Sequence, residues 1–145
     1  MPLRWCSLET IKFRRFSLKT DIWAFGVLIH EVFSNAGLPY PAIRNRDLPD
    51  KLESGYRLPP VGMCPLKVYV LMLKCWDEDP SRRPSAEAIE QEIFECARFS
   101  KDERVRQLRH HFWTVFARFS ARPHPHMRCV RRSTLFYFAP MLIGC

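Results

Sequence analysis

Apolar residues recur at helical spacing in several stretches of the chain, and the longest stretch, about residues 19–34, is apolar on almost every side. Ile22, Phe25 and Ile29 mark one face of this stretch, and Trp23 lies on another. A helix that is apolar all round is buried in the middle of a protein. The pattern therefore predicts a central helix that other segments must cover.

Three further helices are predicted around it. Asp47–Ser54 is typical of a short helix that ends before Gly55, because glycine is favoured just after a helix C-terminus. Pro65 is suited to the first position of the next helix, and Ser85 can cap the last one. In the helix after Pro65 the apolar stripe is Val68, Leu71, Met72, Cys75 and Trp76. In the helix after Ser85 it is Ala86, Ile89, Ile93 and Ala97. No segment alternates as a strand does, so an all-α fold is expected.

Charge divides the chain into two parts. Residues 1–100 contain 14 Lys and Arg against 13 Asp and Glu, a net charge of +1, whereas residues 101–145 contain 9 against 2, a net charge of +7. Almost all of the formal charge of +8 thus lies in the last third. We predict a neutral globular domain over 1–98 and a basic tail over 99–145.

The tail keeps a helical apolar stripe from Val105 to Phe119, with arginines between the apolar positions. This predicts a basic amphipathic helix over 101–121, followed by irregular or disordered chain. Such a helix could bind an anionic membrane surface, an acidic partner or nucleic acid. The alternative is an extension with no selected role, which the abrupt change in composition favours.

The six cysteines show no C-x-x-C motif and no Cys/His spacing suited to zinc, so no metal site is predicted. Reduced thiols in the cytoplasm are the simplest interpretation. The chain opens without a signal-peptide pattern, and no apolar run approaches the roughly 20 residues that span a bilayer. We therefore expect neither a secretory leader nor a membrane span in this sequence.

Six motifs follow one another between residues 2 and 93. They are Pro2-Leu3-Arg4-Trp5-Cys6-Ser7-Leu8-Glu9, Thr20-Asp21-Ile22-Trp23-Ala24-Phe25-Gly26-Val27, Leu38-Pro39-Tyr40-Pro41, Gly55-Tyr56-Arg57-Leu58-Pro59, Cys64-Pro65 with Tyr69, Met72, Cys75 and Trp76, and Asp79-Pro80-Ser81-Arg82-Arg83-Pro84. In this order and spacing they resemble protein tyrosine kinases, from the A-P-E-like element Ser7-Leu8-Glu9 to the D-P-x-x-R-P element. The resemblance implies part of the C-terminal lobe of a kinase catalytic domain, with helices around a buried central helix.

The resemblance also implies structural roles for particular residues. Glu9 corresponds to a glutamate that pairs with the arginine matching Arg83, and such a pair can form a bidentate, partly buried link. Asp21 corresponds to the aspartate that holds the backbone of the catalytic loop. Gly26 lets another segment approach the central helix closely. Trp23 and Trp76 are expected in the core.

Pro2, Leu3 and Trp5 correspond to the shelf on which a substrate peptide lies beside its tyrosine. Protein or peptide substrates are the partners that this resemblance implies. The shelf acts as a steric platform, and no residue of this chain is expected to be catalytic.

The residues that bind and transfer phosphate in kinases are missing from the sequence. A Gly-rich loop, a strand lysine, an H-R-D catalytic loop and a D-F-G magnesium ligand all precede the A-P-E element in the family, and none occurs in the 145 residues. ATP and Mg²⁺ are therefore implied only for the full-length family, and no cofactor or metal residue is assigned here. We expect this chain to be inactive alone.

Two functions of different classes follow, together with the tail-mediated binding described above. The chain is either a fragment of a tyrosine kinase, whose partner is the missing kinase portion, or a non-catalytic kinase-like interaction module. A cytoplasmic location is expected, and a receptor-type parent stays open. In the family the central helix packs against upstream helices that this sequence does not include. We therefore also expect part of its apolar surface to be exposed.

Overall fold

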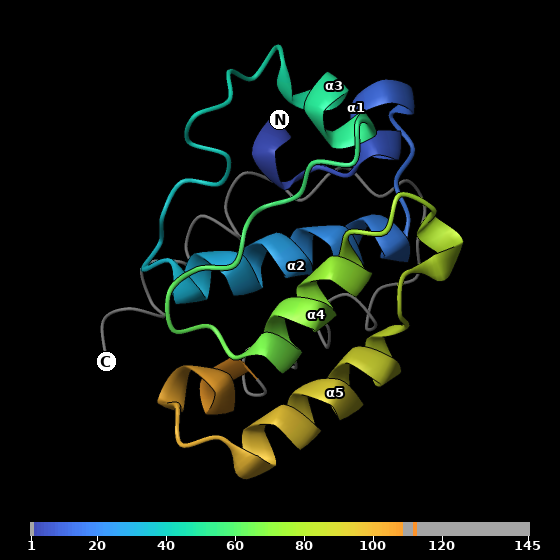
Figure 1. Cartoon of the computed structure of the whole chain (residues 1–145). Helices are drawn as coiled ribbons and strands as arrows, with labels where there is room; N and C mark the ends of the chain where they lie inside the picture. Colours follow the sequence, from blue (N-terminus) through green and yellow to red (C-terminus); the bar gives the residue numbers. More distant parts are fainter. Residues whose placement is uncertain (1, 109–111, 113–145) are drawn as a thin grey trace.

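The computed structural model describes residues 2–108 and 112, which form helices and loops with no strand among them (Figure 1). The elements are η1 (Leu3–Trp5), α1 (Leu8–Phe13), α2 (Leu18–Phe33), α3 (Leu48–Glu53), α4 (Leu66–Cys75), η2 (Pro80–Arg82) and α5 (Ala86–Phe99). Residues 103–108 are helical as well. The predicted all-α kinase-like lobe is confirmed for this part of the chain.

The predicted central helix is α2, and its N-terminus is capped by side chains. The Ser17 hydroxyl accepts a hydrogen bond from the backbone N–H of Lys19, and the Thr20 hydroxyl accepts one from the N–H of Ser17. This reciprocal arrangement satisfies backbone groups that a helix end leaves unpaired. The sequence signal for the start of α2 was therefore accurate to one residue.

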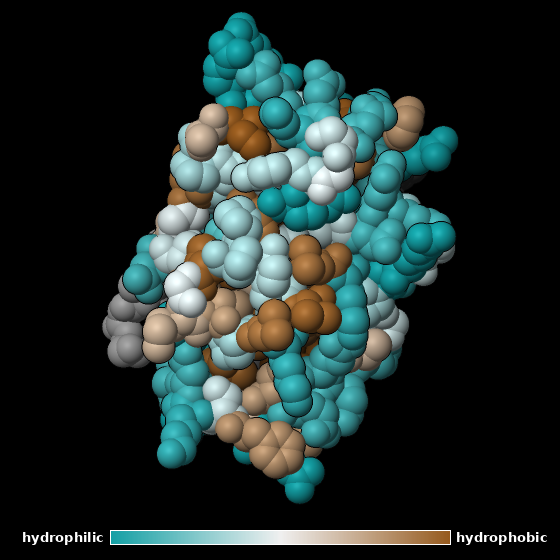
Figure 2. Space-filling view, in the orientation of Figure 1, coloured by the Kyte–Doolittle hydropathy of each residue, from teal (hydrophilic) through white to brown (hydrophobic). Residues whose placement is uncertain are grey.

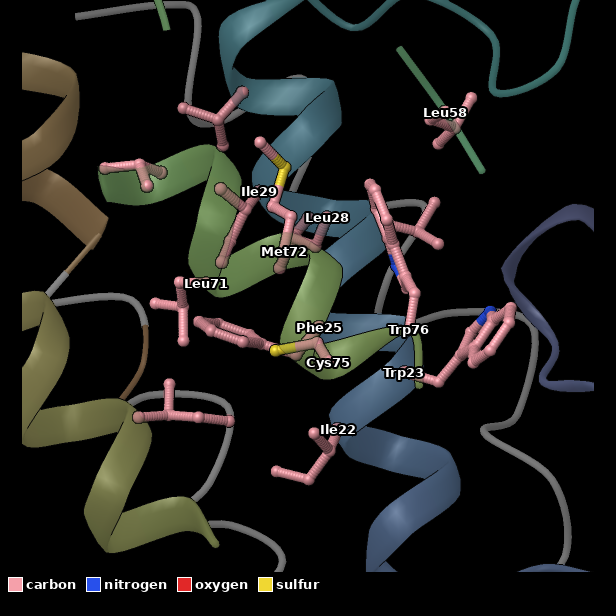
Figure 3. Packing of buried hydrophobic residues seen from close by; sticks show 14 of the residues in the cluster. Ile22, Trp23, Phe25, Leu28, Ile29, Leu58, Leu71, Met72, Cys75 and Trp76 are labelled. Atoms are coloured by element: carbon pink, nitrogen blue, oxygen red, sulfur yellow. The ribbon is translucent and has the colours of Figure 1, made fainter. Parts of the chain in front are cut away.

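The core lies between α2 and α4, which cross in the middle of the molecule (Figure 3). Trp23 and Leu28 of α2 are almost fully buried, as are Met72 of α4 and Trp76 directly after it. Because α4 covers one side of α2, and η1 and η2 also contact the helix, the all-round apolar pattern of α2 is accounted for (Figure 1). Both tryptophans are core residues, as expected.

The expectation that part of the apolar surface of α2 is exposed is wrong beyond the first turn of the helix, although Leu18 at its start is 56 % exposed. From Ile22 to Phe33 every residue of α2 is buried except Ala24, which is half-buried. Residues outside the predicted globular domain contribute to this burial, because Val105, Leu108 and Phe112 belong to the same hydrophobic cluster. The chain itself thus supplies material that covers α2.

The helices near the two ends of the sequence differ from the pattern-based predictions. Helix α1 was not predicted. Helix α5 ends at Phe99 and Ser100 is extended, so the chain turns before the next helical segment begins at residue 103. The predicted helix over 101–121 is described only over 101–108 and at 112, and its other residues lie outside the described part. The domain division between 98 and 99 stays a prediction.

The face drawn in Figure 2 is largely hydrophilic, with a small apolar group over α4. Leu66, Val70 and Leu73 on the outward face of α4 are exposed by 75, 42 and 40 %. Within the described residues no helix has the length and the hydrophobicity needed to cross a membrane.

Candidate functional site

The segment expected to receive a peptide, Pro2–Trp5, is fixed to the end of α2 and the loop that follows. The indole N–H of Trp5 donates to Glu31 Oε2 at 2.7 Å. Burial raises the pKa of Glu31, and the hydrogen bond from Trp5 opposes that rise. Pro2, Leu3 and Trp5 are all half-buried, so each presents part of its surface to solvent.

Arg4 holds the same segment from the other direction. Its guanidinium donates to the carbonyl oxygens of Pro39 at 2.8 Å and Ile43 at 2.9 Å, and also to that of Tyr40. Tyr40 is buried and has a backbone φ of 53°, a left-handed conformation that is uncommon for a non-glycine residue. Three hydrogen bonds from one side chain therefore fix the α2–α3 loop beside the shelf. Sequence reasoning missed Arg4, because backbone carbonyl partners leave no trace in a residue pattern.

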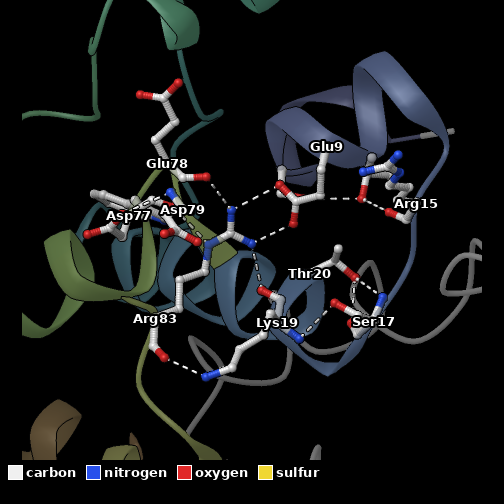
Figure 4. A network of polar contacts seen from close by, with 12 residues as sticks. Glu9, Arg15, Ser17, Lys19, Thr20, Asp77, Glu78, Asp79 and Arg83 are labelled. Atoms are coloured by element: carbon white, nitrogen blue, oxygen red, sulfur yellow. Dashed lines mark hydrogen bonds and ion pairs between the residues drawn. The ribbon is translucent and has the colours of Figure 1, made fainter. Parts of the chain in front are cut away.

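Glu9 and Arg83 form a bidentate ion pair across 74 positions of sequence (Figure 4). Arg83 Nη1 lies 2.6 Å from Glu9 Oε1, and Nη2 lies 2.9 Å from Oε2. Burial raises the pKa of Glu9, but the hydrogen bonds and charge of Arg83 outweigh it and the pKa is lowered overall. The pair predicted from the two motifs is thus present.

Arg83 is the centre of a wider network in Figure 4. Its guanidinium also donates to the backbone oxygens of Asp77 at 2.8 Å and Lys19 at 2.9 Å, and the residue is only 2 % exposed. It lies over the ring of Trp23, with 5.0 Å between the guanidinium carbon and the ring centroid. A charge this deeply buried is stable only because its donors are paired. The network joins α1, α2 and the loop before α5.

Trp23 has a second guanidinium against its ring, that of Arg57, at 4.9 Å. Arg57 donates from Nε to the carbonyl of Trp76 and from Nη1 to that of Leu52. Trp23 therefore contributes by packing and by contact with two cations. The pattern Gly55-Tyr56-Arg57-Leu58-Pro59 marked this arginine, but its role was not assigned from sequence.

Asp21, in the first turn of α2, differs from the other carboxylates near this network. Its Oδ2 is buried and has no hydrogen-bond partner among the described residues. Burial raises the pKa of Asp21 to about 6. An unpaired buried carboxylate oxygen is costly and rare in folded proteins.

Gly26 lies where α4 crosses α2. A β-carbon at this position would lie 2.6 Å from Trp76 Nε1 and 2.9 Å from Cys75 Cβ. Only glycine allows α2 and α4 to approach this closely. The glycine thus fixes the spacing between the two central helices.

The described residues contain no cluster of three His, Cys, Asp or Glu side chains placed to hold a metal. Cys64, in the loop before α4, and Cys75, at the end of α4, are protonated at neutral pH, since burial raises the pKa of Cys64 to about 11 and of Cys75 to about 12. Neither of these thiols is therefore an activated nucleophile.

The sequence pattern of the protein tyrosine and serine/threonine kinase family matches residues 1–93. Human Tyrosine-protein kinase Srms is 42 % identical over 93 residues, which are 64 % of this chain and 19 % of that protein. The Apis mellifera Epidermal growth factor receptor is 42 % identical and the human Receptor tyrosine-protein kinase erbB-4 is 41 % identical, each over 98 residues, which are 68 % of this chain and 8 % of the relative. The chain thus spans less than a fifth of the length of these relatives.

Proposed function

Because the chain belongs to the protein tyrosine and serine/threonine kinase family, we propose that it provides the peptide-binding side of a tyrosine kinase catalytic domain, which as a whole transfers phosphate from ATP to protein tyrosines. The observation that carries this proposal is the anchoring of Pro2–Trp5. Arg4 and Trp5 hold the segment through side chains of their own, so its backbone has one fixed course. A fixed course is what a steric platform for an extended peptide requires.

Within this platform the three shelf residues have different parts. Trp5 directs its indole N–H inward to Glu31 and supports the shelf. Pro2 and Leu3 have no such polar group and offer apolar surface to the residue that follows the substrate tyrosine. Substrate proteins with an apolar residue there would gain the most from this surface.

ATP and Mg²⁺ belong to the complementary part of the domain in this proposal. The described carboxylates are scattered or paired, and no three of them converge as a magnesium site does. The sequence has no glycine-rich phosphate loop. We therefore derive no step of phosphate transfer from residues of this chain.

Asp21 is the proposed contact with the complementary part. Its buried Oδ2 lacks a donor in the described chain, and backbone N–H groups of a second segment would satisfy it. Such contacts would lower the pKa of Asp21 from about 6 toward its usual value, because hydrogen bonds favour the charged carboxylate. This change offers a readout of assembly that does not depend on catalysis.

The first test is enzymatic. The purified 145-residue chain, mixed with Mg-ATP labelled at the terminal phosphate and a tyrosine-containing peptide, should transfer no phosphate and show no ATP-dependent rise in melting temperature. Turnover that survives repurification and is lost in an Arg83→Met variant would overturn the proposal that the chain lacks the ATP site.

The second test is peptide binding to the same chain, measured by NMR shift perturbation with a tyrosine peptide that carries an apolar residue after the tyrosine. Leu3→Glu should abolish the shifts. Leu66→Glu is the matched control, since Leu66 is exposed on α4 away from η1, and it should leave them unchanged. Equal binding by both variants would remove the shelf from the proposal.

A non-catalytic interaction module is the second candidate. The completeness of the core around α2 favours it, because a chain that covers its own central helix can persist without the rest of a kinase domain. Transcript sequences upstream of the Met1 codon distinguish the two. An in-frame Gly-rich loop, H-R-D and D-F-G would support the kinase fragment, and an upstream in-frame stop would support the module.

A cytoplasmic location fits both candidates. The four cysteines at 6, 64, 75 and 96 are free thiols, as expected for a reducing compartment. Binding of a membrane or nucleic acid by the tail concerns residues that mostly lie outside the described part, and stays a prediction.

A further inference from the structure

The helical segment after α5 belongs to the hydrophobic core, although it follows residue 93, where the family match ends. Val105 is fully buried, and Leu108 and Phe112 are each 2 % exposed. Their spacing of three and four residues places all three on one face of a helix. The apolar stripe of this segment is therefore used inside the chain.

Two aromatic contacts define where the segment lies. The ring of Phe112 meets that of Phe25 edge-on, with 5.3 Å between centroids. The guanidinium of Arg104 lies over the ring of Phe33 at 4.9 Å. The order of these contacts is reversed along α2, so the segment runs antiparallel to the C-terminal half of that helix.

The start of the segment is held by polar contacts. Asp102 caps it, since its Oδ1 accepts from the backbone N–H of Arg104 at 2.9 Å, and the Ser100 hydroxyl accepts from the N–H of Asp102 at 3.1 Å. Arg104 is also ion-paired with Asp102 at 2.7 Å. In Figure 1 the segment turns back after α5 toward the first turn of α4. Capping and two aromatic contacts together fix both its ends.

Charge places this segment with the globular part of the chain. Residues 101–108 contain three basic and two acidic residues, a net charge of +1, whereas residues 109–145 contain six basic and no acidic residues, a net charge of +6. The two acidic residues, Asp102 and Glu103, are paired with Arg104 and Arg106. The change in charge therefore comes after residue 108, ten residues later than the end of the predicted domain.

We propose that residues 101–108 and Phe112 form an internal cover, which occupies the apolar face of α2 near Phe25 and Phe33 and closes that face to any other polypeptide. The occupant of the face is this segment of the same chain. The proposal does not rest on kinase activity, and it gives the extension a structural role that the family match does not include.

The first experiment uses two substitutions in the full chain. Val105→Asp places a charge in the buried stripe, and Phe112→Ala removes the ring that meets Phe25. Each should lower the melting temperature by about 10 °C or more and increase amide hydrogen exchange in the C-terminal half of α2. Arg106→Ala is the matched control, because Arg106 lies on the exposed side, and it should shift the melting temperature by less than about 2 °C. Melting and exchange that are unchanged in both variants would overturn the proposal.

The second experiment tests occupancy directly and tolerates a loss of stability. A fluorescent peptide with the sequence of residues 101–116 is titrated into each full-length protein, and binding is followed by anisotropy. The wild-type chain should not bind it detectably, whereas a Phe112→Ala chain that is still helical by circular dichroism should bind at least ten times more tightly. Equal binding by wild type and variants, or no binding by a folded variant, would show that the face is not covered in this way.

Discussion

The two halves of α2 meet their surroundings by different means. At the N-terminal half, polar groups from distant motifs converge, with the Glu9–Arg83 pair fully formed and Asp21 left without a donor. Toward the C-terminal half the hydrogen bond from Trp5 to Glu31 is joined by contacts with aromatic rings from residues beyond the family match, namely Phe112 against Phe25 at the middle of the helix and Arg104 over Phe33. The same helix thus carries one end that lacks a partner and one end that the chain completes itself.

The family resemblance implies both a folded lobe and a contact with the rest of a catalytic domain, and these two properties concern different halves of α2. Asp21 keeps a buried carboxylate oxygen without a donor, which we proposed above as the contact with a complementary segment. The C-terminal half needs no such segment to bury its apolar residues. Burial of the helix and the proposed contact with a complementary segment therefore involve different parts of the surroundings of α2.

Removing the Arg83 guanidinium from the polar contacts at the N-terminal half of α2 should have the largest effect on stability. Arg83→Met leaves Glu9 buried without its partner and frees the carbonyl groups of Asp77 and Lys19, so we expect a loss of about 3–5 kcal/mol in the free energy of unfolding. Urea unfolding followed by tryptophan fluorescence measures it. Arg82→Ala, next in sequence but exposed, should cost less than about 0.5 kcal/mol.

The double substitution Glu9→Gln with Arg83→Met sharpens this test. If the penalty comes from an uncompensated charge, the double variant should be more stable than Arg83→Met alone, because the glutamine removes the unpaired carboxylate. A double variant that is less stable by the sum of both single losses would show that the pair contributes through packing instead.

Gly26 links the two halves, and its substitution should come next in size. Gly26→Ala places a β-carbon within 2.9 Å of Cys75 Cβ and forces α4 away from α2, so the expected loss is about 1–3 kcal/mol despite the better helix propensity of alanine. Thermal melting measures the change. Stabilisation by this variant would contradict the close packing of the two helices.

The sequence predicted some features of the fold closely and missed others. The start of α2 at Leu18 and the positive φ of Gly55 were predictable, because capping hydroxyls and C-terminal glycines act within one helical turn. Pro65 was one residue off, since it is the N-cap of α4 and does not lie inside the helix. Helix α1 was missed because six residues show no clear period, and it packs mainly on α3.

Some contacts around α2 could likewise be predicted from the sequence, and others could not. The Glu9–Arg83 pair could be anticipated because two motifs of a known family lie at its ends. The cover by Val105, Leu108 and Phe112 could not, since the helical stripe in the tail says that one face is apolar but not what it packs against. From sequence alone the stripe left open a surface that binds a membrane, an acidic partner or nucleic acid, and an extension with no selected role, and only the fold shows that its described part faces α2.

Replacing the unpaired carboxylate of Asp21 with a neutral amide should raise the free energy of unfolding. The pKa of Asp21 is about 6 in the folded state and 3.8 in the reference state, so the folded protein binds more protons between these values and loses stability as the pH rises through that window. Asp21→Asn should therefore add about 1–2 kcal/mol at pH 7.5 and very little at pH 3.5. Asp50→Asn on α3 is the control, since Asp50 is an exposed carboxylate in the first turn of that helix. Unfolding curves at the two pH values decide the matter, and an equal effect of Asp21→Asn at both would contradict a buried, unpaired carboxylate.

The smallest effect is expected at the C-terminal half, from Arg104. Arg104→Ala removes a partly exposed ion pair with Asp102 and the contact with the Phe33 ring, which together should contribute about 0.5–1 kcal/mol. Arg104→Lys keeps the charge but not the flat guanidinium, so it should recover the ion pair and only part of the ring contact. Measuring both variants in low and in high salt separates the two contributions, because salt screens the exposed ion pair more than the contact with the ring. A loss that vanishes entirely in high salt would mean that the polar contacts alone hold this end of the cover, and that the two halves of α2 differ less than the aromatic contacts indicate.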